Sequence, residues 1–359
     1  MDLTPEFLIA AALTVFFAIL FALFLYQTLK RNRRAYILTT GIFFGILAGL
    51  ITAIIELQLF PDWGSELLRI ELIVWALMYG CLYLFLEETE TTSPNGIRFS
   101  IVITLFTGFL VFSFISLHPE AVNMQLDLWW DFFYNGLGVF IFGFGIYSFF
   151  KTYLFGRELE PLVQSIGMVF VVAGFCLSFY GDLTGESLGI LADALKIVGL
   201  LVFIAVFILR IDFIYRLPIE VFSIAIYTNT GFPIYIARSK HAREIETIDH
   251  TLLAGMFQAL NNIIQNATGS ISTIKELSSK DRVITFYSSE KVTVAAVVDR
   301  STHFLENALM GTALLIEKRY SDELGESVLD TSRLTECASI TADSFPFLVL
   351  EPVKENERI

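Results

Sequence analysis

The feature that most constrains this chain is a series of seven apolar runs that ends abruptly at Pro218. A helix needs about 20 predominantly apolar residues to cross the hydrocarbon core of a bilayer, and each run is long enough. The runs cover residues 6–29, 36–59, 67–87, 97–117, 129–150, 161–181 and 189–213. They predict an all-α, seven-helix transmembrane domain over residues 1–217, with a separate domain after Pro218.

The basic residues of the short loops predict the orientation of these helices. Lys and Arg concentrate at one set of helix ends, at positions 30, 31, 33, 34, 98, 151, 157, 210 and 216, whereas the opposite ends hold Arg69. Basic loops stay on the cytoplasmic side. We therefore expect a multi-pass protein of the cell membrane, with its N-terminus outside, an uncleaved first helix, and a cytoplasmic C-terminal domain.

Charge and cysteine content exclude several classes of function. The formal net charge is -13, and no segment concentrates Lys and Arg as nucleic-acid binding requires. The three cysteines, Cys81, Cys176 and Cys337, have neither metal-ligand spacing nor a disulfide pattern. The sequence predicts no nucleic-acid partner, no metal and no cofactor.

Ionisable side chains within the predicted spans are candidates for a functional site, because charge inside hydrocarbon is costly. They fall in the outer halves or at the outer ends of five helices, and aromatic residues accompany them. One interpretation is a set of interfacial charges in water with a local Asp193–Lys196 pair; the other is a polar pocket open to the outside. The candidate pocket residues are Glu56, Arg69, Glu71, Trp75, Tyr79, Asp131, Tyr134, Tyr180, Asp182, Asp193 and Lys196.

Small residues recur at four-residue spacing in the second predicted helix. Gly41, Gly45, Gly49 and Ala53 lie on one helix face, where another backbone can approach closely. The spacing predicts a packing seam. Whether the seam packs within the chain or joins two protomers stays open from sequence.

Retinal binding and transport are two further candidate functions of the helical half. Lys196 in the seventh span, with Glu71 as a counter-ion, is compatible with a retinal-binding protein, but the sixth span lacks a Trp. A transporter typically has helices broken near the midplane and an internal repeat, and the sequence has neither. Both functions are less favoured than a sensor.

After Pro218 the sequence pattern changes to that of a small α+β domain. Residues 219–228 and 232–237 read as a strand pair around the turn Asn229-Thr230-Gly231. An amphipathic helix follows near 248–266, and its apolar face, which includes Met256, should be buried. The remaining elements are three strands, near 270–277, 281–288 and 291–298, and a helix near 301–319.

This ββαβββα order predicts a five-stranded antiparallel sheet with packed helices over residues 218–320. The hairpin TNTGFPIYIA, the helix LLAGMFQALNNII, the run RVITFYSSEKVTVAAVVDR and the helix FLENALMGTALLIEKRY resemble the longin and roadblock families, with a profilin-like order. The resemblance implies a non-catalytic platform that dimerises or binds small GTPases or other signalling proteins. In layout, the seven-helix half is similar to the sensor region that precedes many histidine kinases.

The sequence contains no motif that predicts an enzyme. There is no nucleophile elbow, no zinc-protease motif and no phosphate-binding loop. Residues 321–359 form an acidic C-terminal extension, in which the apolar patch 345–350 is expected to dock as a lid or extra strand, or to bind a partner.

The favoured interpretation is a receptor-like sensor and adaptor that couples the bundle to a cytoplasmic protein, with a small GTPase as the candidate partner. The seventh helix would carry the signal through a short junction made by Arg210, Arg216, Leu217 and Pro218. The alternative is a membrane-anchored dimerisation scaffold without sensing.

Overall fold

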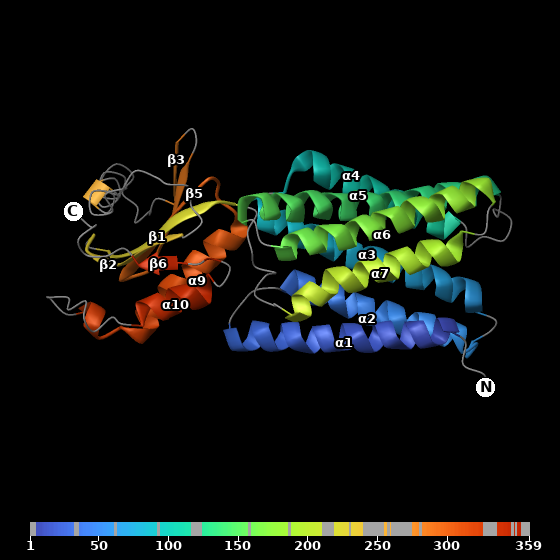
Figure 1. Cartoon of the computed structure of the whole chain (residues 1–359), viewed down its shortest axis with the longest axis horizontal. Helices are drawn as coiled ribbons and strands as arrows, with labels where there is room; N and C mark the ends of the chain where they lie inside the picture. Colours follow the sequence, from blue (N-terminus) through green and yellow to red (C-terminus); the bar gives the residue numbers. More distant parts are fainter. Residues whose placement is uncertain are drawn as a thin grey trace. The chain divides into compact units, whose positions relative to one another are not determined.

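The fold was determined as a computed structural model, which forms two compact units (Figure 1). Unit 1 comprises Met1–Glu87, Pro94–Tyr153 and Glu158–Ile211, and unit 2 comprises Glu88–Ser93, Leu154–Arg157 and Asp212–Ile359. The structure describes residues 5–31, 36–60, 63–91, 94–115, 124–156, 159–185, 188–209, 219–229, 231–239, 255–256, 259, 275–279, 282–325, 336–345, 348 and 350–352.

Within these residues the membrane half contains seven helices, as predicted, and Figure 1 shows them side by side with similar axes. Their bounds are α1 Pro5–Arg31, α2 Tyr36–Glu56, α3 Gly64–Glu90, α4 Gly96–Ile115, α5 Met124–Gly156, α6 Leu159–Thr184 and α7 Gly189–Leu209. Four helices, α1, α3, α5 and α6, extend beyond the predicted spans at both ends; in α3 the added residues are mainly polar, including Glu66 and Glu90.

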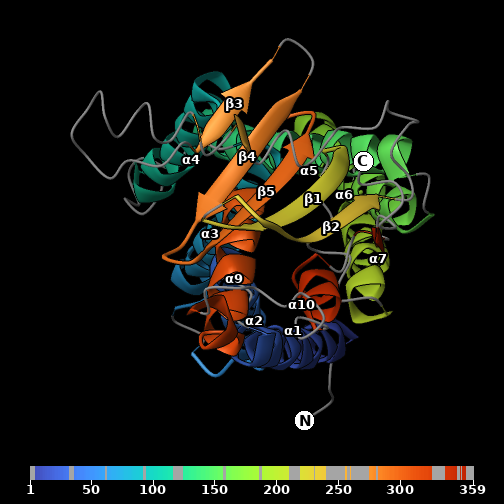
Figure 2. The same cartoon turned by 90° about the vertical axis from the view of Figure 1, so that its left-hand side faces the viewer.

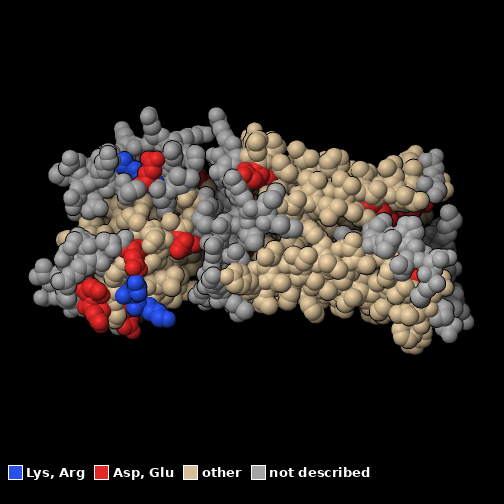
Figure 3. Space-filling model, turned by 60° about the horizontal axis from the view of Figure 1, so that its bottom comes forward, with Lys and Arg blue, Asp and Glu red and all other residues tan. Residues whose placement is uncertain are grey.

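Among the described residues, α2 to α7 each contain a stretch long and apolar enough to cross a membrane. In α1 the apolar stretch found is the shorter Thr14–Tyr26. Large apolar side chains are exposed along the helices, for example Ile19, Leu50, Ile103, Val169 and Leu201. On the face of unit 1 in Figure 3, acidic side chains appear towards the ends and the middle is uncharged. These features are those of a multi-pass membrane protein, and its orientation stays a prediction.

Glycines set the closest helix approaches in unit 1. A Cβ at Gly41 would lie 2.9 Å from Cys81 Cβ on α3, and one at Gly45 would lie 3.1 Å from the Phe17 ring on α1 and from the Met78 sulfur on α3. At Gly49 a Cβ would collide with Thr14 of α1. These three seam glycines of α2 therefore face helices of the same chain.

A second seam, between α6 and α7, was not predicted from sequence. A Cβ at Gly167 would lie 2.7 Å from the Gly199 carbonyl oxygen, and one at Gly174 would lie 2.7 Å from the Ala192 carbonyl oxygen. No side chain fits between the two backbones at these points. Glycine is required here because the α6 and α7 backbones approach closely. Small residues serve the same purpose at many contacts between transmembrane helices.

Unit 2 is built on an antiparallel sheet whose strand order is β3-β4-β5-β1-β2-β6. Its strands are β1 Val221–Thr228, β2 Pro233–Ser239, β3 Glu276–Ser278, β4 Val283–Ser288, β5 Val292–Val298 and β6 Leu350–Pro352. The β1–β2 turn closes at Gly231, whose φ of 83° and N–H bond of 2.9 Å to the Thr228 carbonyl suit glycine. The five-stranded antiparallel sheet is confirmed, although the third predicted strand, 270–277, is described only from residue 275 and β3 itself is Glu276–Ser278. A sixth strand, β6, begins at Leu350, the last residue of the apolar patch.

One face of the sheet packs on helices α9 His303–Arg319 and α10 Cys337–Ser344 (Figure 2). Leu305, Leu309, Ala313 and Ile316 of α9 are fully buried against Ile224, Ile226 and Val294. The Thr302 hydroxyl accepts a bond from Leu305 N–H and caps α9. Because Cys337 and Phe345 belong to the same core, residues beyond 320 contribute to this domain rather than only trailing it.

The other sheet face carries a second apolar cluster of Ala225, Tyr227, Ile236, Phe286 and Ala295, all buried. The helix predicted over 248–266 lies outside the described residues, except for Gly255, Met256 and Ala259, which are helical. Met256 is 49% exposed, so the prediction that its face is buried is wrong at this position. Apolar periodicity identifies a face but does not specify what covers each residue of it.

Candidate functional site

Glu71 is a carboxylate held inside the helical bundle by hydrogen bonds from two helices. Its Oε1 accepts bonds from Thr52 Oγ1 of α2, at 2.7 Å, and from Trp75 Nε1, one turn along α3, at 3.2 Å. Thr52 and Glu71 are both half-buried. These two donors fix the position of a charge in an apolar setting, where an unsatisfied polar group costs several kcal/mol (about 2–7).

The aromatic candidates surround a buried pair of tyrosines. The Tyr79 and Tyr134 hydroxyls lie 3.3 Å apart, joining α3 to α5. The Tyr79 ring stacks on Trp75 with 6.4 Å between centroids and meets Phe142 and Phe175 edge-on at 5.4 and 5.7 Å. Edge-on and offset contacts at these separations are the favoured geometries for aromatic rings. The predicted polar pocket is thus largely a packed aromatic cluster.

Lys196 reaches the edge of this cluster from α7. Its Nζ lies 3.1 Å from Asp193 Oδ1, as the three-residue spacing predicted, and 5.1 Å from the centre of the Phe175 ring. The stem of Lys196 packs over Gly174, where a Cβ would lie 2.6 Å from its Cγ. The cation therefore has a carboxylate and a ring face as partners.

The remaining candidates lie at the same end of the bundle but are more exposed than the tyrosine pair. Tyr180 is 51% exposed and Asp182 is also exposed. Glu56, Arg69 and Asp131 are half-buried. The structure thus joins Glu71, Trp75, Tyr79, Tyr134, Lys196 and Asp193 into one contiguous set.

The row of side chains on α3 continues to the other end of the bundle through Tyr83 and Glu87, which were not predicted as site residues. Tyr83 is 1% exposed, and its ring lies 6.0 Å from that of Phe144 on α5. Glu87 is buried and accepts a 2.6 Å bond from the Asn95 backbone N–H. We call the five side chains at four-residue spacing the α3 ladder: Glu71, Trp75, Tyr79, Tyr83 and Glu87. The four-residue spacing is present in the sequence, but Glu87 ends the predicted span 67–87, where a charge is typical of the membrane interface.

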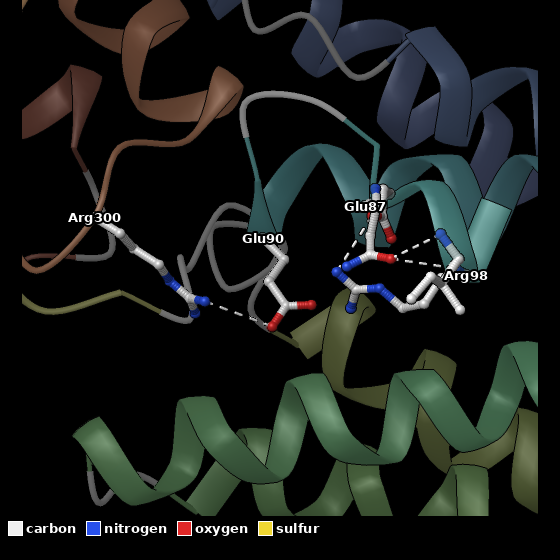
Figure 4. A network of polar contacts seen from close by, with 6 residues as sticks. Glu87, Glu90, Arg98 and Arg300 are labelled. Atoms are coloured by element: carbon white, nitrogen blue, oxygen red, sulfur yellow. Dashed lines mark hydrogen bonds and ion pairs between the residues drawn. The ribbon is translucent and has the colours of Figure 1, made fainter.

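Arg98 completes this end of the ladder (Figure 4). Its Nη2 lies 3.3 Å from Glu87 Oε1, and its guanidinium lies 4.4 Å from the centre of the Phe144 ring. Asn95 Oδ1 accepts bonds from the Ile97 and Arg98 N–H groups, at 3.1 and 3.3 Å, so it caps α4. Glu87 thereby holds the residue that starts the next helix.

A second ion pair belongs to unit 2, to which Glu88–Ser93 is assigned. Arg300 Nη1, between β5 and α9, lies 3.7 Å from Glu90 Oε1 (Figure 4). The Glu90 side chain is 4% exposed and that of Arg300 is 31% exposed, so the carboxylate is the more desolvated partner.

A separate cavity in unit 1 has almost no polar lining. Its walls are Phe17, Leu20, Phe24, Leu38, Gly41, Ile42, Met78, Leu82, Phe142, Leu200, Phe203 and Ile204. Lys196 is not among them, so the cavity offers no chromophore site around that lysine. Water needs two to four polar partners, and this lining does not supply them.

The other predictions for the site concern metals and the domain junction. Among the described residues, no group of three or more His, Cys, Asp and Glu side chains is placed to hold a metal ion. The predicted junction of Arg210, Arg216, Leu217 and Pro218 lies outside the described residues.

Comparison with known proteins adds no assignment, since no protein-family model, no curated protein and no solved structure matches this chain.

Proposed function

We propose that this chain is a membrane sensor and adaptor whose helical unit responds to a stimulus and whose sheet unit binds a cytoplasmic protein. The observation that carries the proposal is the α3 ladder, which places a carboxylate near each end of one helix with buried aromatic residues between them. Polar and ionisable side chains inside a membrane domain are costly and commonly mark function. A passive anchor needs only the apolar surface and the glycine seams.

The form of unit 2 supports the binding half of the proposal. The antiparallel sheet has helices on one face, an arrangement that is compatible with the resemblance to longin domains. The helix expected between β2 and β3 lies largely outside the described residues. That resemblance implies a non-catalytic platform, with a small GTPase as the candidate partner. Fold likeness alone does not establish function, so the partner class is a proposal that rests on resemblance.

The test uses the full-length chain in lipid nanodiscs as bait in a native lysate, with GTP analogue, GDP or no nucleotide. Wild type is compared with Glu71→Gln and with a matched control, Asp182→Asn, which removes one charge at an exposed site at the same end of the bundle. The proposal predicts nucleotide-dependent recovery of a small GTPase that changes in Glu71→Gln and is unchanged in Asp182→Asn.

Equal recovery by all three proteins would contradict sensing and favour the membrane-anchored scaffold. If the bait recovers only copies of itself, the scaffold is a dimerising one. A visible absorption band that depends on Lys196, or solute uptake by proteoliposomes, would instead favour the retinal-binding or transport alternatives.

A further inference from the structure

The α3 ladder spans most of the depth of the bundle. Glu71 and Glu87 are separated by 16 residues, which corresponds to about 24 Å at a rise of 1.5 Å per residue. The hydrocarbon core of a bilayer is about 30 Å thick. Each four-residue step turns by about 40° around the helix axis, so the ladder winds by about 160° between Glu71 and Glu87. A winding row on a single helix therefore connects a hydrogen-bonded carboxylate near one end with an ion pair near the other.

The first half of the ladder is a continuous series of side-chain contacts. Glu71 accepts the Trp75 indole N–H at 3.2 Å, Trp75 stacks on Tyr79, and the Tyr79 hydroxyl meets that of Tyr134. Glu56 on α2 and Asp193 on α7 are the other carboxylates whose charge acts on Glu71, and Thr52 is its hydroxyl donor. A change in the charge of Glu71 would alter each of these interactions.

The second half runs through rings of α5 that lie beside the ladder. Phe142 contacts Tyr79 at 5.4 Å, and Phe144, two residues further along α5, contacts Tyr83 at 6.0 Å. The same Phe144 ring lies under the Arg98 guanidinium, which pairs with Glu87. All four rings are at least nine-tenths buried, so each is held by close packing. The Tyr79–Phe142 and Tyr83–Phe144 pairs are linked to each other through the α3 and α5 backbones, because Phe142 and Phe144 do not face each other.

We propose that α3 and the adjoining α5 rings transmit a change of charge at Glu71 to the Glu87–Arg98 ion pair, and so to the start of α4. This inference rests on the proposed function and assigns its path, in addition to the route through α7 that the sequence suggested. The group that would respond is the Asn95 backbone N–H, which donates a hydrogen bond to Glu87. The Asn95 side chain caps the start of α4. Loosening Glu87 would release this amide and fray the first turn of α4.

The Asn95 N–H makes the path measurable. Hydrogen exchange of peptides covering residues 94–99 is followed by mass spectrometry in the full-length chain in nanodiscs, for wild type, Glu71→Gln, Tyr79→Leu and the double variant. Coupling between sites is commonly 1–3 kcal/mol, equivalent to about 5–150-fold. We expect Glu71→Gln to change the exchange rate of this segment by about fivefold or more.

The ladder predicts that the effect of Glu71→Gln disappears when Tyr79→Leu is already present, because the stacking and hydroxyl contacts are lost. Tyr180→Leu, at an exposed tyrosine of the same end, is the matched control and should leave the effect intact. Glu87→Gln is the direct positive control for a freed Asn95 N–H. The inference is overturned if Glu71→Gln leaves 94–99 unchanged, or if its effect survives Tyr79→Leu.

The same samples separate this inference from the proposed function. A coupled response at 94–99 with unaltered partner recovery would retain the path and remove the sensor-adaptor function. Altered partner recovery with no response at 94–99 would retain the function and remove this path.

Discussion

At the scale of single residues, burial distinguishes the polar side chains that mark a candidate site from those that lie at the membrane interface. Glu71 and Glu87 both lie in an apolar bundle, yet each is bonded to donors from a neighbouring segment. The position of an ionisable residue within a span identified Glu71 from the sequence, and the aromatic residues near such charges gave Trp75, Tyr79 and Tyr134. It did not identify Glu87 or Arg98, because a charge at the end of an apolar run reads as interfacial until its burial is known.

Cys337 gives a residue-scale prediction in unit 2, outside the membrane spans. Burial, with a smaller effect from Glu336, raises the pKa of the thiol from 9.0 to about 11. The folded state therefore keeps a proton that the unfolded state loses first. The thiol's contribution to stability is complete below pH 9 and is lost as pH rises from 9 towards 11.

We expect Cys337→Ala to reduce the loss of stability between pH 9 and 11, measured by thermal unfolding of the full chain in detergent. Tyr235 and Tyr320, whose pKa values burial also raises, will retain part of the pH dependence. An unchanged pH profile in Cys337→Ala would contradict the assignment.

At the scale of helices and strands, the sequence predicted the existence of most elements correctly. Apolar length specified all seven helices, and alternation with turn residues specified five strands. The α6–α7 seam was not predicted, although Gly167, Gly174 and Gly181 recur at seven-residue spacing, because the approach of Gly167 to Gly199 depends on how two helices pair. The sequence does not distinguish a strand from a lid near residue 350, because β6 has only three residues and is defined by its pairing with β2.

The α6–α7 seam predicts a sharp contrast between two glycine substitutions. Gly167→Ala places a methyl group against the α7 backbone and should destabilise the bundle by about 1–3 kcal/mol, the usual cost of overpacking. Gly143→Ala in α5 meets no atom within 4 Å and should be neutral or stabilising by about 0.5–1 kcal/mol. Unfolding in SDS mixed micelles measures both, and equal effects would contradict the packing.

The C-terminal elements predict that the sheet domain depends on residues beyond 320. Phe345 is 0% exposed in the main core, so Phe345→Ala should cost about 3–5 kcal/mol. The exposed Phe232→Ala is the control and should change stability little. Protease resistance of unit 2 in the full chain reports the difference, and equal resistance would show that this extension is not part of the core.

At the scale of the whole molecule, the sequence predicted an apolar helical domain followed by an antiparallel sheet domain. The described residues form these two units. Orientation, partner and stimulus remain predictions, since positive charge in loops and fold resemblance bear on them only indirectly. The sequence assigned signalling to α7 through a junction outside the described residues. The α3 ladder supplies a second route whose contacts lie within one unit.

The most direct measurement of the central claim is hydrogen exchange over the sheet domain, compared among wild type, Glu71→Gln and Asp182→Asn in nanodiscs. A sensor predicts that Glu71→Gln changes exchange in β1, β5 or α9, far along the chain from the substitution, while Asp182→Asn does not. Sheet-domain exchange that is identical in all three proteins, with changes confined to α2 and α3, would contradict the sensor account and leave the helices as an anchor.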